Sequence, residues 1–325
     1  MATTLKEQFK KDGFIIVKNF FDKAILTQIY TEARQIFAVQ IKRVVGVDVD
    51  IDNRDEFEKA MFAFFEKDFP SFVNTGKQVQ HLISLHRLGT DPSISSLLKE
   101  IGYEFPIIGV RPAMQFNSRY LSKGGSHWKL GSHQDWRTGQ GSLDSAVCWF
   151  PLVDCGADLG SLQIIPGSHR NGLLDAQGNG YLGTIKEELP EDKFVQTSFE
   201  VGDLLLFSAF LVHRSGENST QNIRWSIQLR YNNMEEKTFQ ERGFPMPYIY
   251  KPEEELVTPN FPKREMLDKI SDQVRDTTEF SQIDSIQSTS SSSENENSMI
   301  ILMIGLSCSA VIYITINRHT FFIYI

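Results

Sequence analysis

The spacing of apolar residues near the start of the chain changes from that of a strand to that of a helix. The segment DGFIIVKNF, residues 12–20, is a short apolar run bounded by polar residues, which is typical of a strand. After it, apolar residues recur every three or four positions, as on one face of a helix, at Ile25, Leu26, Ile29, Ala33 and Phe37. Asp22 suits the N-cap of that helix because a carboxylate can accept hydrogen bonds from free backbone N–H groups. The chain is therefore expected to open with a strand followed by a helix.

The helical spacing continues further along and then gives way to a different pattern. Residues 54–101 keep helical spacing, interrupted at Pro70 and at the stretch GTDPS. From Ile107 the chain consists of short β-type runs separated by Gly, Pro, Asn and Asp, namely IIGVRPAMQFN, SAVCWFPLV, SLQII, FVQTSFE, DLLLFSAF and IRWSIQLRYN. Many short strands after several helices predict an α+β fold, a β sandwich or jelly roll buttressed by N-terminal helices.

The composition changes again near residue 270, which is expected to end the globular domain of residues 1–270. Residues 271–298 are rich in serine and poor in apolar side chains, which predicts a polar linker. Residues 299–317 lie in an uncharged run that, at about 1.5 Å per helical residue, spans roughly 30 Å, the thickness of a bilayer core. We therefore predict a C-terminal transmembrane anchor there and membrane association. Two alternatives stay open: an interfacial or aggregation-prone segment, given the ending HTFFIYI, or an AT-rich extension that is not selected for structure.

Charge and cysteine content narrow the function classes. The chain has 41 acidic and 33 basic residues, a net charge of -8, and no cluster of Lys and Arg that could follow a phosphate backbone, so nucleic acid is not an expected partner. Cys148, Cys155 and Cys308 form no CxxC pair and no even disulfide framework, which favours a reducing compartment. The N-terminus has no apolar core of signal-peptide length. We expect a cytoplasmic catalytic domain, facing the cytoplasm if the chain is anchored.

The stretch GSHQDWRTGQ places a histidine and an aspartate two positions apart. Alternate residues of a strand point to the same face, so His133 and Asp135 could present an imidazole nitrogen and a carboxylate oxygen to one metal ion. This pair alone fits equally well a histidine that is satisfied by a nearby carboxylate.

A second histidine favours the metal. His213 follows the apolar strand VGDLLLF, in a position to complete a metal site from the opposite side of a barrel. Two histidines and one carboxylate on one face of a metal form the facial triad of non-heme iron(II) oxygenases, which leaves vacancies for a bidentate cosubstrate and O2. The predicted metal ligands and catalytic residues are therefore His133, Asp135 and His213.

Eleven residues after His213 comes a strand with strict alternation, IRWSIQLRY. If its apolar set faces the helices, its polar set, which includes Arg224 and Ser226, faces the interior of the barrel. A guanidinium there could hold a cosubstrate carboxylate with two parallel hydrogen bonds, and the serine could add a hydroxyl donor. The other interpretation of the polar set is a solvated outer face.

These segments together resemble a known family, the phytanoyl-CoA dioxygenase-like iron(II)/2-oxoglutarate-dependent oxygenases. HQD at 133–135, GSLQIIPGSH at 160–169, VGDLLLFSAFLVHRSGEN at 201–218 and Arg224 agree with the family pattern in order and spacing, over roughly residues 8–235. The resemblance implies a double-stranded β-helix, a cupin-like barrel, with iron at the triad and 2-oxoglutarate on Arg224. It also implies that Trp149 lines the cosubstrate pocket, although a core aromatic is nearly as good an interpretation.

Four other residues in and near these segments are weaker candidates for the functional site. The Pro-Gly pair before His169 is a turn signal, so His169 is expected to be structural. His127 lies in a glycine-containing stretch and is only a candidate on the substrate side. Trp136 and Arg137 directly follow the aspartate and could contact substrate.

The resemblance implies hydroxylation of an unactivated C–H bond of a small organic substrate, with consumption of O2 and 2-oxoglutarate and release of succinate and CO2. Asp135 favours hydroxylation because related halogenases have a small residue at that position. The substrate cannot be inferred, since residues 118–131 and 170–193, which would select it, carry no motif. Two alternatives remain, an inactive membrane-tethered binding barrel and a cupin-type metal isomerase, and the latter would not need Arg224 and Ser226.

Overall fold

The structure is a computed structural model that describes residues 3–122, 130–177 and 183–245, together with three strands near the C-terminus. The chain divides into two compact units, residues 1–251 and 252–325. The described elements of the first unit are, in order, α1 (Leu5–Asp12), β1 (Phe14–Val17), α2 (Lys23–Val45), α3 (Arg54–Lys67), α4 (Phe69–Gln78), η1 (Val79–His81), α5 (Ile83–Gly89), α6 (Pro92–Glu100), β2 (Pro106–Asn117), α7 (Trp136–Gly139), β3 (Ala146–Pro151), β4 (Leu162–Ile164), η2 (Ser168–Asn171), β5 (Ala176–Gln177), β6 (Thr184–Ile185), η3 (Glu191–Lys193), β7 (Val195–Gln196), β8 (Leu204–Ser208), β9 (His213–Ser215), β10 (Arg224–Asn233) and α8 (Lys237–Glu241).

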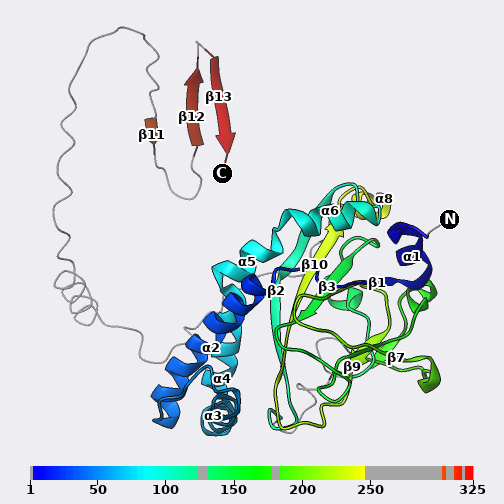
Figure 1. Ribbon diagram of the computed structural model, residues 1–325. Helices are drawn as coiled ribbons and strands as arrows, with labels where there is room; N and C mark the ends of the chain where they lie inside the picture. The colour runs from blue at the N-terminus through cyan, green and yellow to red at the C-terminus, as the bar shows by residue number, and fades with distance from the viewer. Residues whose placement is uncertain are drawn as a thin grey trace. The chain divides into compact units, whose positions relative to one another are not determined.

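The first unit is an α+β jelly roll, as the sequence predicts. One antiparallel sheet has the strand order β1-β8-β3-β10-β2, and a second has the order β7-β4-β9. Helices α2 to α5 lie on one side of the larger sheet (Figure 1). Asp22 caps α2 through a hydrogen bond from the Ala24 N–H, also as predicted.

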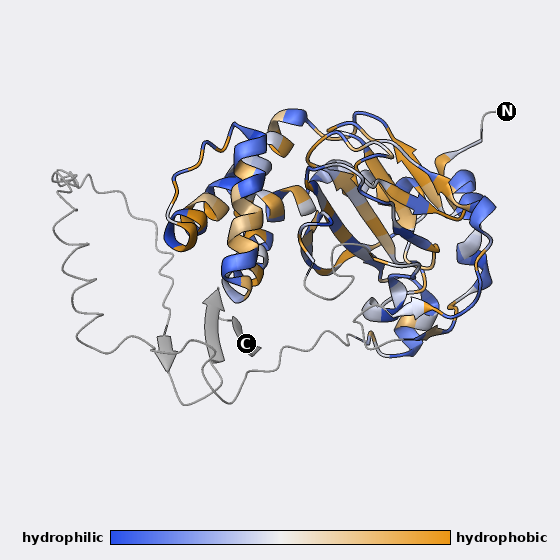
Figure 2. Cartoon of the chain, turned by 90° about the horizontal axis from the view of Figure 1, so that it is seen from below, coloured by the Kyte–Doolittle hydropathy of each residue, from blue (hydrophilic) through white to orange (hydrophobic). Residues whose placement is uncertain are grey.

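Strand β10 has the two faces that its alternation predicts. Its apolar residues Trp225, Ile227, Leu229 and Tyr231, and Ile223 directly before the strand, all belong to the larger core between the sheet and the helices. Trp225 lies within ring-contact distance of Tyr30 and Phe37 from α2 and of Phe116 from β2. Figure 2, coloured by hydropathy, shows apolar residues in orange along the strands and helices that form this core. The opposite face of β10 is thereby left for the interior of the jelly roll.

A second, smaller core fills this interior between the two sheets. Val147, Trp149, Leu205 and Phe207 of the larger sheet share it with residues of β4. The inner face of the jelly roll therefore carries an apolar part, on β3 and β8, and a polar part, on β10. This division positions the candidate site.

The chain contains three further strands, β11 (Leu302–Ile304), β12 (Val311–Ile316) and β13 (His319–Tyr324), which pair antiparallel. The helix predicted at 299–317 is wrong for the described residues of this segment, because they form strands. The β-branched and aromatic side chains of VIYITI favour strands, whereas the prediction rested on length and absence of charge. Among the described residues, no helix has the length and apolar character needed to cross a membrane.

At Gly13, which joins α1 to β1, the addition of a single methyl group is expected to destabilise the fold. Gly13 has φ +79°, and a Cβ built on it would lie 2.3 Å from the Nδ1 atom of His169. Left-handed backbone is strained for alanine, and His169 Nε2 is anchored on the Lys10 carbonyl at 3.2 Å. We expect Gly13→Ala to lower the free energy of unfolding by about 1–3 kcal/mol in urea denaturation. Gly139→Ala is the control, since a Cβ there meets nothing within 4 Å, and an equal loss in both variants would contradict this assignment.

Candidate metal centre and cosubstrate pocket

His133 and His213 lie side by side although eighty positions separate them in the sequence. They form an isolated antiparallel bridge, in which the His133 N–H donates to the His213 carbonyl (3.0 Å) and the His213 N–H donates to the His133 carbonyl (3.2 Å). The ring centroids are 4.2 Å apart. The backbone pairing at the start of β9 thus brings the two predicted histidines together.

The orientation of each imidazole is set by a backbone carbonyl. Nδ1 of His133 lies 2.6 Å from the Gly131 carbonyl, and Nδ1 of His213 lies 3.0 Å from the Leu211 carbonyl. A carbonyl can only accept, so each Nδ1 carries the hydrogen and each Nε2 presents a lone pair. This is the arrangement by which proteins orient histidines that bind metals.

The three predicted ligand atoms converge. His133 Nε2 is 3.5 Å and His213 Nε2 is 4.0 Å from Asp135 Oδ1, and one ligand atom from each residue lies within 4.8 Å of the others. All three residues are at most 3% exposed, and these three atoms have no hydrogen-bond partner within the described chain. Leaving buried polar atoms unpaired is costly. The donor set of two imidazole nitrogens and one carboxylate oxygen fits a divalent iron ion.

The protonation states also suit a metal. Burial and the neighbouring His133 lower the pKa of His213 to about 4, so this imidazole is neutral near pH 7. Burial alone would raise the pKa of Asp135, but the Arg230 guanidinium and the two imidazoles hold it well below its usual range. The site therefore offers a neutral imidazole and an ionised carboxylate without first losing protons.

Arg224 lies inside the jelly roll with no carboxylate partner among the described residues. It is 1% exposed, its NH1 group donates to the Gly160 carbonyl, and its NH2 group lies 3.5 Å from Ser215 Oγ. Within the described part of the chain, its Nε has no hydrogen-bond partner. Burial lowers the pKa of Arg224 to about 10, which leaves the guanidinium charged at neutral pH. A buried cation without a counter-ion is unfavourable, so this position is suited to an anionic ligand.

The other two predicted cosubstrate residues face the same interior. The buried Ser226 Oγ and Trp149 Nε1 have no hydrogen-bond partner among the residues that the structure describes. Ser226 is two positions from Arg224 on β10, and the Trp149 ring lies 5.8 Å from the Arg224 guanidinium carbon. Trp149 also belongs to the inner core and contacts Phe199, as expected of a core aromatic, and its place in the cosubstrate pocket stays a prediction.

The sequence interpretation assigned no role to Asn117 and Ser215. Asn117 pairs with Arg224 across β2 and β10, and both polar atoms of its side chain are buried without a partner. Ser215 follows His213 by two positions on β9, on the same face of the strand. Because two residues of a strand span about 7 Å, the Arg224 guanidinium contacts β9 about that far along the strand from His213.

The turn that follows Asp135 carries Trp136 and Arg137, the two weaker substrate candidates. Trp136 stacks on Phe210 with ring centroids 5.1 Å apart, and its Nε1–H donates to the Ser142 carbonyl. Arg137 donates to the Leu174 carbonyl. Both side chains therefore have structural partners. Trp136 also lines a small hollow together with Asp135.

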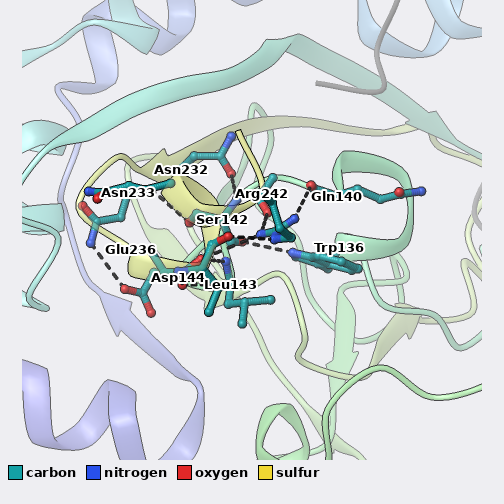
Figure 3. Close-up of polar contacts among 12 residues, drawn as sticks. Trp136, Gln140, Ser142, Leu143, Asp144, Asn232, Asn233, Glu236 and Arg242 are labelled. Atoms are coloured by element: carbon teal, nitrogen blue, oxygen red, sulfur yellow. Dashed lines mark hydrogen bonds and ion pairs between the residues drawn. The ribbon is translucent and has the colours of Figure 1, made fainter. Parts of the chain in front are cut away.

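Side chains from the end of β10 and from the region of α8 hold this turn (Figure 3). Asn232 Oδ1 accepts from the Ser142 N–H (3.1 Å), Glu236 Oε2 accepts from the Leu143 N–H (2.9 Å), and the Arg242 NH2 group donates to the Gly141 carbonyl (2.8 Å). The backbone next to Asp135 is thus fixed by residues about one hundred positions further along the chain.

The remaining histidine candidates have different outcomes. His169 packs on the end of α1, where it contacts the Lys10 carbonyl, which agrees with the structural role expected for it. His127 lies outside the described residues.

Comparisons with known proteins agree with this geometry. The family model of phytanoyl-CoA dioxygenase (PhyH) matches residues 9–226, more than half of the chain, so the protein belongs to the phytanoyl-CoA dioxygenase family. The chain is 25% identical over 255 residues to a phytanoyl-CoA dioxygenase of Arabidopsis thaliana, covering 68% of this chain and 85% of the relative. It is 24% identical over 254 residues to a phytanoyl-CoA dioxygenase domain-containing protein 1 homolog of Dictyostelium discoideum, covering 69% and 88%.

Similar solved structures include two non-heme enzymes. The epimerase SnoN, in complex with Fe3+, alpha ketoglutarate and nogalamycin RO, is 18% identical with a TM-score of 0.49, covering 70% of this chain and 82% of that one. The non-heme monooxygenase ThoJ is 19% identical with a TM-score of 0.47, covering 70% and 77%.

Proposed function

We propose that this member of the family is an iron(II)- and 2-oxoglutarate-dependent dioxygenase that hydroxylates an unactivated C–H bond of a small organic substrate. The observation that carries the proposal is a pair of complementary clusters. His133, Asp135 and His213 present three unpartnered ligand atoms to one point, and the buried Arg224 guanidinium lies against Ser215, two strand positions from His213. A 2-oxoacid that chelates a metal at one end and carries a second carboxylate at the other would satisfy both clusters.

Each group of the chain has a distinct task in this proposal. The triad would hold iron, which when bound supplies the vacant positions at which 2-oxoglutarate and O2 meet, with release of succinate and CO2. Arg224 would bind the distal carboxylate, with Ser226, Asn117 and Trp149 as further donors. Leu205 and Phe207, both fully buried on the inner face, would exclude water from the reacting groups.

The experiment that tests the hydroxylase activity uses the purified full chain with iron(II), 2-oxoglutarate, O2 and a small-molecule extract. We expect succinate formation coupled to a metabolite that gains one oxygen atom. The matched control is His213→Ala with the same extract, which should form neither product. Succinate formation coupled to a product of unchanged mass would contradict hydroxylation but would still support 2-oxoglutarate as the cosubstrate. Turnover that does not depend on 2-oxoglutarate would favour a cupin-type isomerase.

The unpartnered hydroxyl of Ser226 gives a smaller prediction. One hydrogen bond to the cosubstrate contributes about 0.5–1.5 kcal/mol, so Ser226→Ala should weaken 2-oxoglutarate binding by roughly 2- to 12-fold, as measured by calorimetric titration of the metal-loaded protein. Ser145→Ala is the matched control, because its hydroxyl is also buried and unpartnered but lines the hollow beside Trp136. Equal effects of the two substitutions would remove Ser226 from the cosubstrate site.

A further inference from the structure

Arg230 is a cation beside the candidate metal centre, and the alternation of β10 places it on the polar face of that strand. It lies on β10, six positions after Arg224, and its side chain is 20% exposed. Its ion-pair partner among the described residues is Asp135, the carboxylate of the triad.

The geometry of this pair leaves one carboxylate oxygen free. The Nε and NH2 groups of Arg230 both donate to Asp135 Oδ2, at 3.2 and 3.1 Å. The other oxygen, Oδ1, is the atom that faces the Nε2 atoms of His133 and His213. An arginine placed symmetrically would occupy both oxygens. The arrangement therefore turns Asp135 into a ligand with a single available oxygen.

The guanidinium is itself held in place by β10. Its NH2 group donates to Oε1 of Gln228, which is 2% exposed and lies on the same strand. Two register shifts between β10 and β2 flank Arg230, and in both the extra residue lies on β2, whereas β10 keeps a continuous register with β3. The alternation of β10 is therefore unbroken, and Arg230 lies on the same face of the strand as Arg224 and Ser226. One strand thus carries Arg224 for the cosubstrate and Arg230 against the metal ligand.

We propose that Arg230 is a positioning residue that fixes Asp135 as a ligand through one oxygen and balances its charge in the buried site. The inference rests on the proposed function, because it requires that the triad binds a metal. It assigns Arg230 no contact with substrate, so its effect should appear in metal binding before any cosubstrate is added.

The test is an anaerobic titration of the full chain with cobalt(II), a coloured probe for the iron site, without 2-oxoglutarate or substrate. Arg230→Gln should lower the cobalt affinity by about 10- to 100-fold, the usual cost of losing a partner of a metal ligand, and should change the visible bands of the bound metal. The cobalt affinity of Arg230→Lys should lie between those of the wild type and Arg230→Gln, because an ammonium keeps the charge but lacks the planar fork. The control is Arg214→Gln, which removes a solvent-exposed ion pair with Glu191 at the residue next to His213.

A double-mutant cycle separates action through Asp135 from a general structural role. In an Asp135→Asn background, Arg230→Gln should cause little further loss of cobalt affinity. Independent, multiplying losses would overturn the proposal, as would wild-type cobalt affinity and spectrum in Arg230→Gln. If His213→Ala also bound cobalt like the wild type, the metal site itself, and with it the proposed function, would be wrong.

Discussion

Replacement of His133 or His213 by alanine is expected to abolish stoichiometric iron(II) binding. Each substitution removes one of three protein ligands and leaves an unpartnered polar atom of the triad buried. The loss should exceed the roughly 100-fold effect of removing a hydrogen-bond partner of a ligand. The measurement is the iron content of the full chain after anaerobic equilibrium dialysis.

The control for the histidine substitutions is His86→Ala. His86 stacks on His81 in the helical layer at 5.9 Å and is remote from the triad in the fold. This variant should bind one iron(II) per chain, like the wild type. Retention of iron by both triad variants would place the metal elsewhere.

The second large effect is expected at Arg224. Arg224→Ala should weaken 2-oxoglutarate binding by 3–5 kcal/mol, more than 100-fold, because the distal carboxylate would be buried without its partner. Iron affinity should change little, since no atom of Arg224 belongs to the triad. Arg224→Lys should rescue only partly, lacking the planar fork. Calorimetric titration of the metal-loaded variants with 2-oxoglutarate measures all three effects.

The stability of the apo-protein gives an independent measure for Arg224. A buried cation without a carboxylate partner destabilises the fold, so Arg224→Ala should leave the unfolding temperature unchanged or raise it. A variant that binds 2-oxoglutarate normally, or that loses binding only because it unfolds, would contradict a cosubstrate role.

Local sequence pattern was sufficient to predict one part of the site. The alternation of β10 separates Trp225 and its apolar neighbours, which pack on the helices, from Arg224 and Ser226, which face the interior. Period-two patterning is a local property of a strand, so it can be recognised before the fold is known. The strand geometry expected for His133 and Asp135 is wrong at Asp135, which has helical backbone angles (φ -65°, ψ -28°) directly before α7, although the two side chains do converge.

Contacts that depend on strand register could not be predicted in this way. Asn117 lies beside Arg224 only because β2 pairs with β10 with Asn117 opposite Arg224. The alternation of β10 places Arg230 on the same face as Arg224, but it does not indicate that Asp135 is its partner. Nothing in the period of either strand specifies a pairing between residues that lie about one hundred positions apart.

In the C-terminal segment the prediction of a transmembrane helix was wrong because it used only length and the absence of charge. An uncharged run of bilayer length satisfies the criterion for a transmembrane helix. It does not weigh the β-branched and aromatic residues that favour the strands at 311–316 and 319–324.

The most direct test of the central claim is whether 2-oxoglutarate binds only to the metal-loaded protein. The measurement is calorimetric titration of the full chain with 2-oxoglutarate under anaerobic conditions, once with iron(II) and once after removal of metal by a chelator. We expect one 2-oxoglutarate per chain with iron(II) and much weaker binding without it, because the metal and Arg224 hold opposite ends of the same molecule. Absence of binding with iron(II), or equal binding with and without metal, would contradict the account.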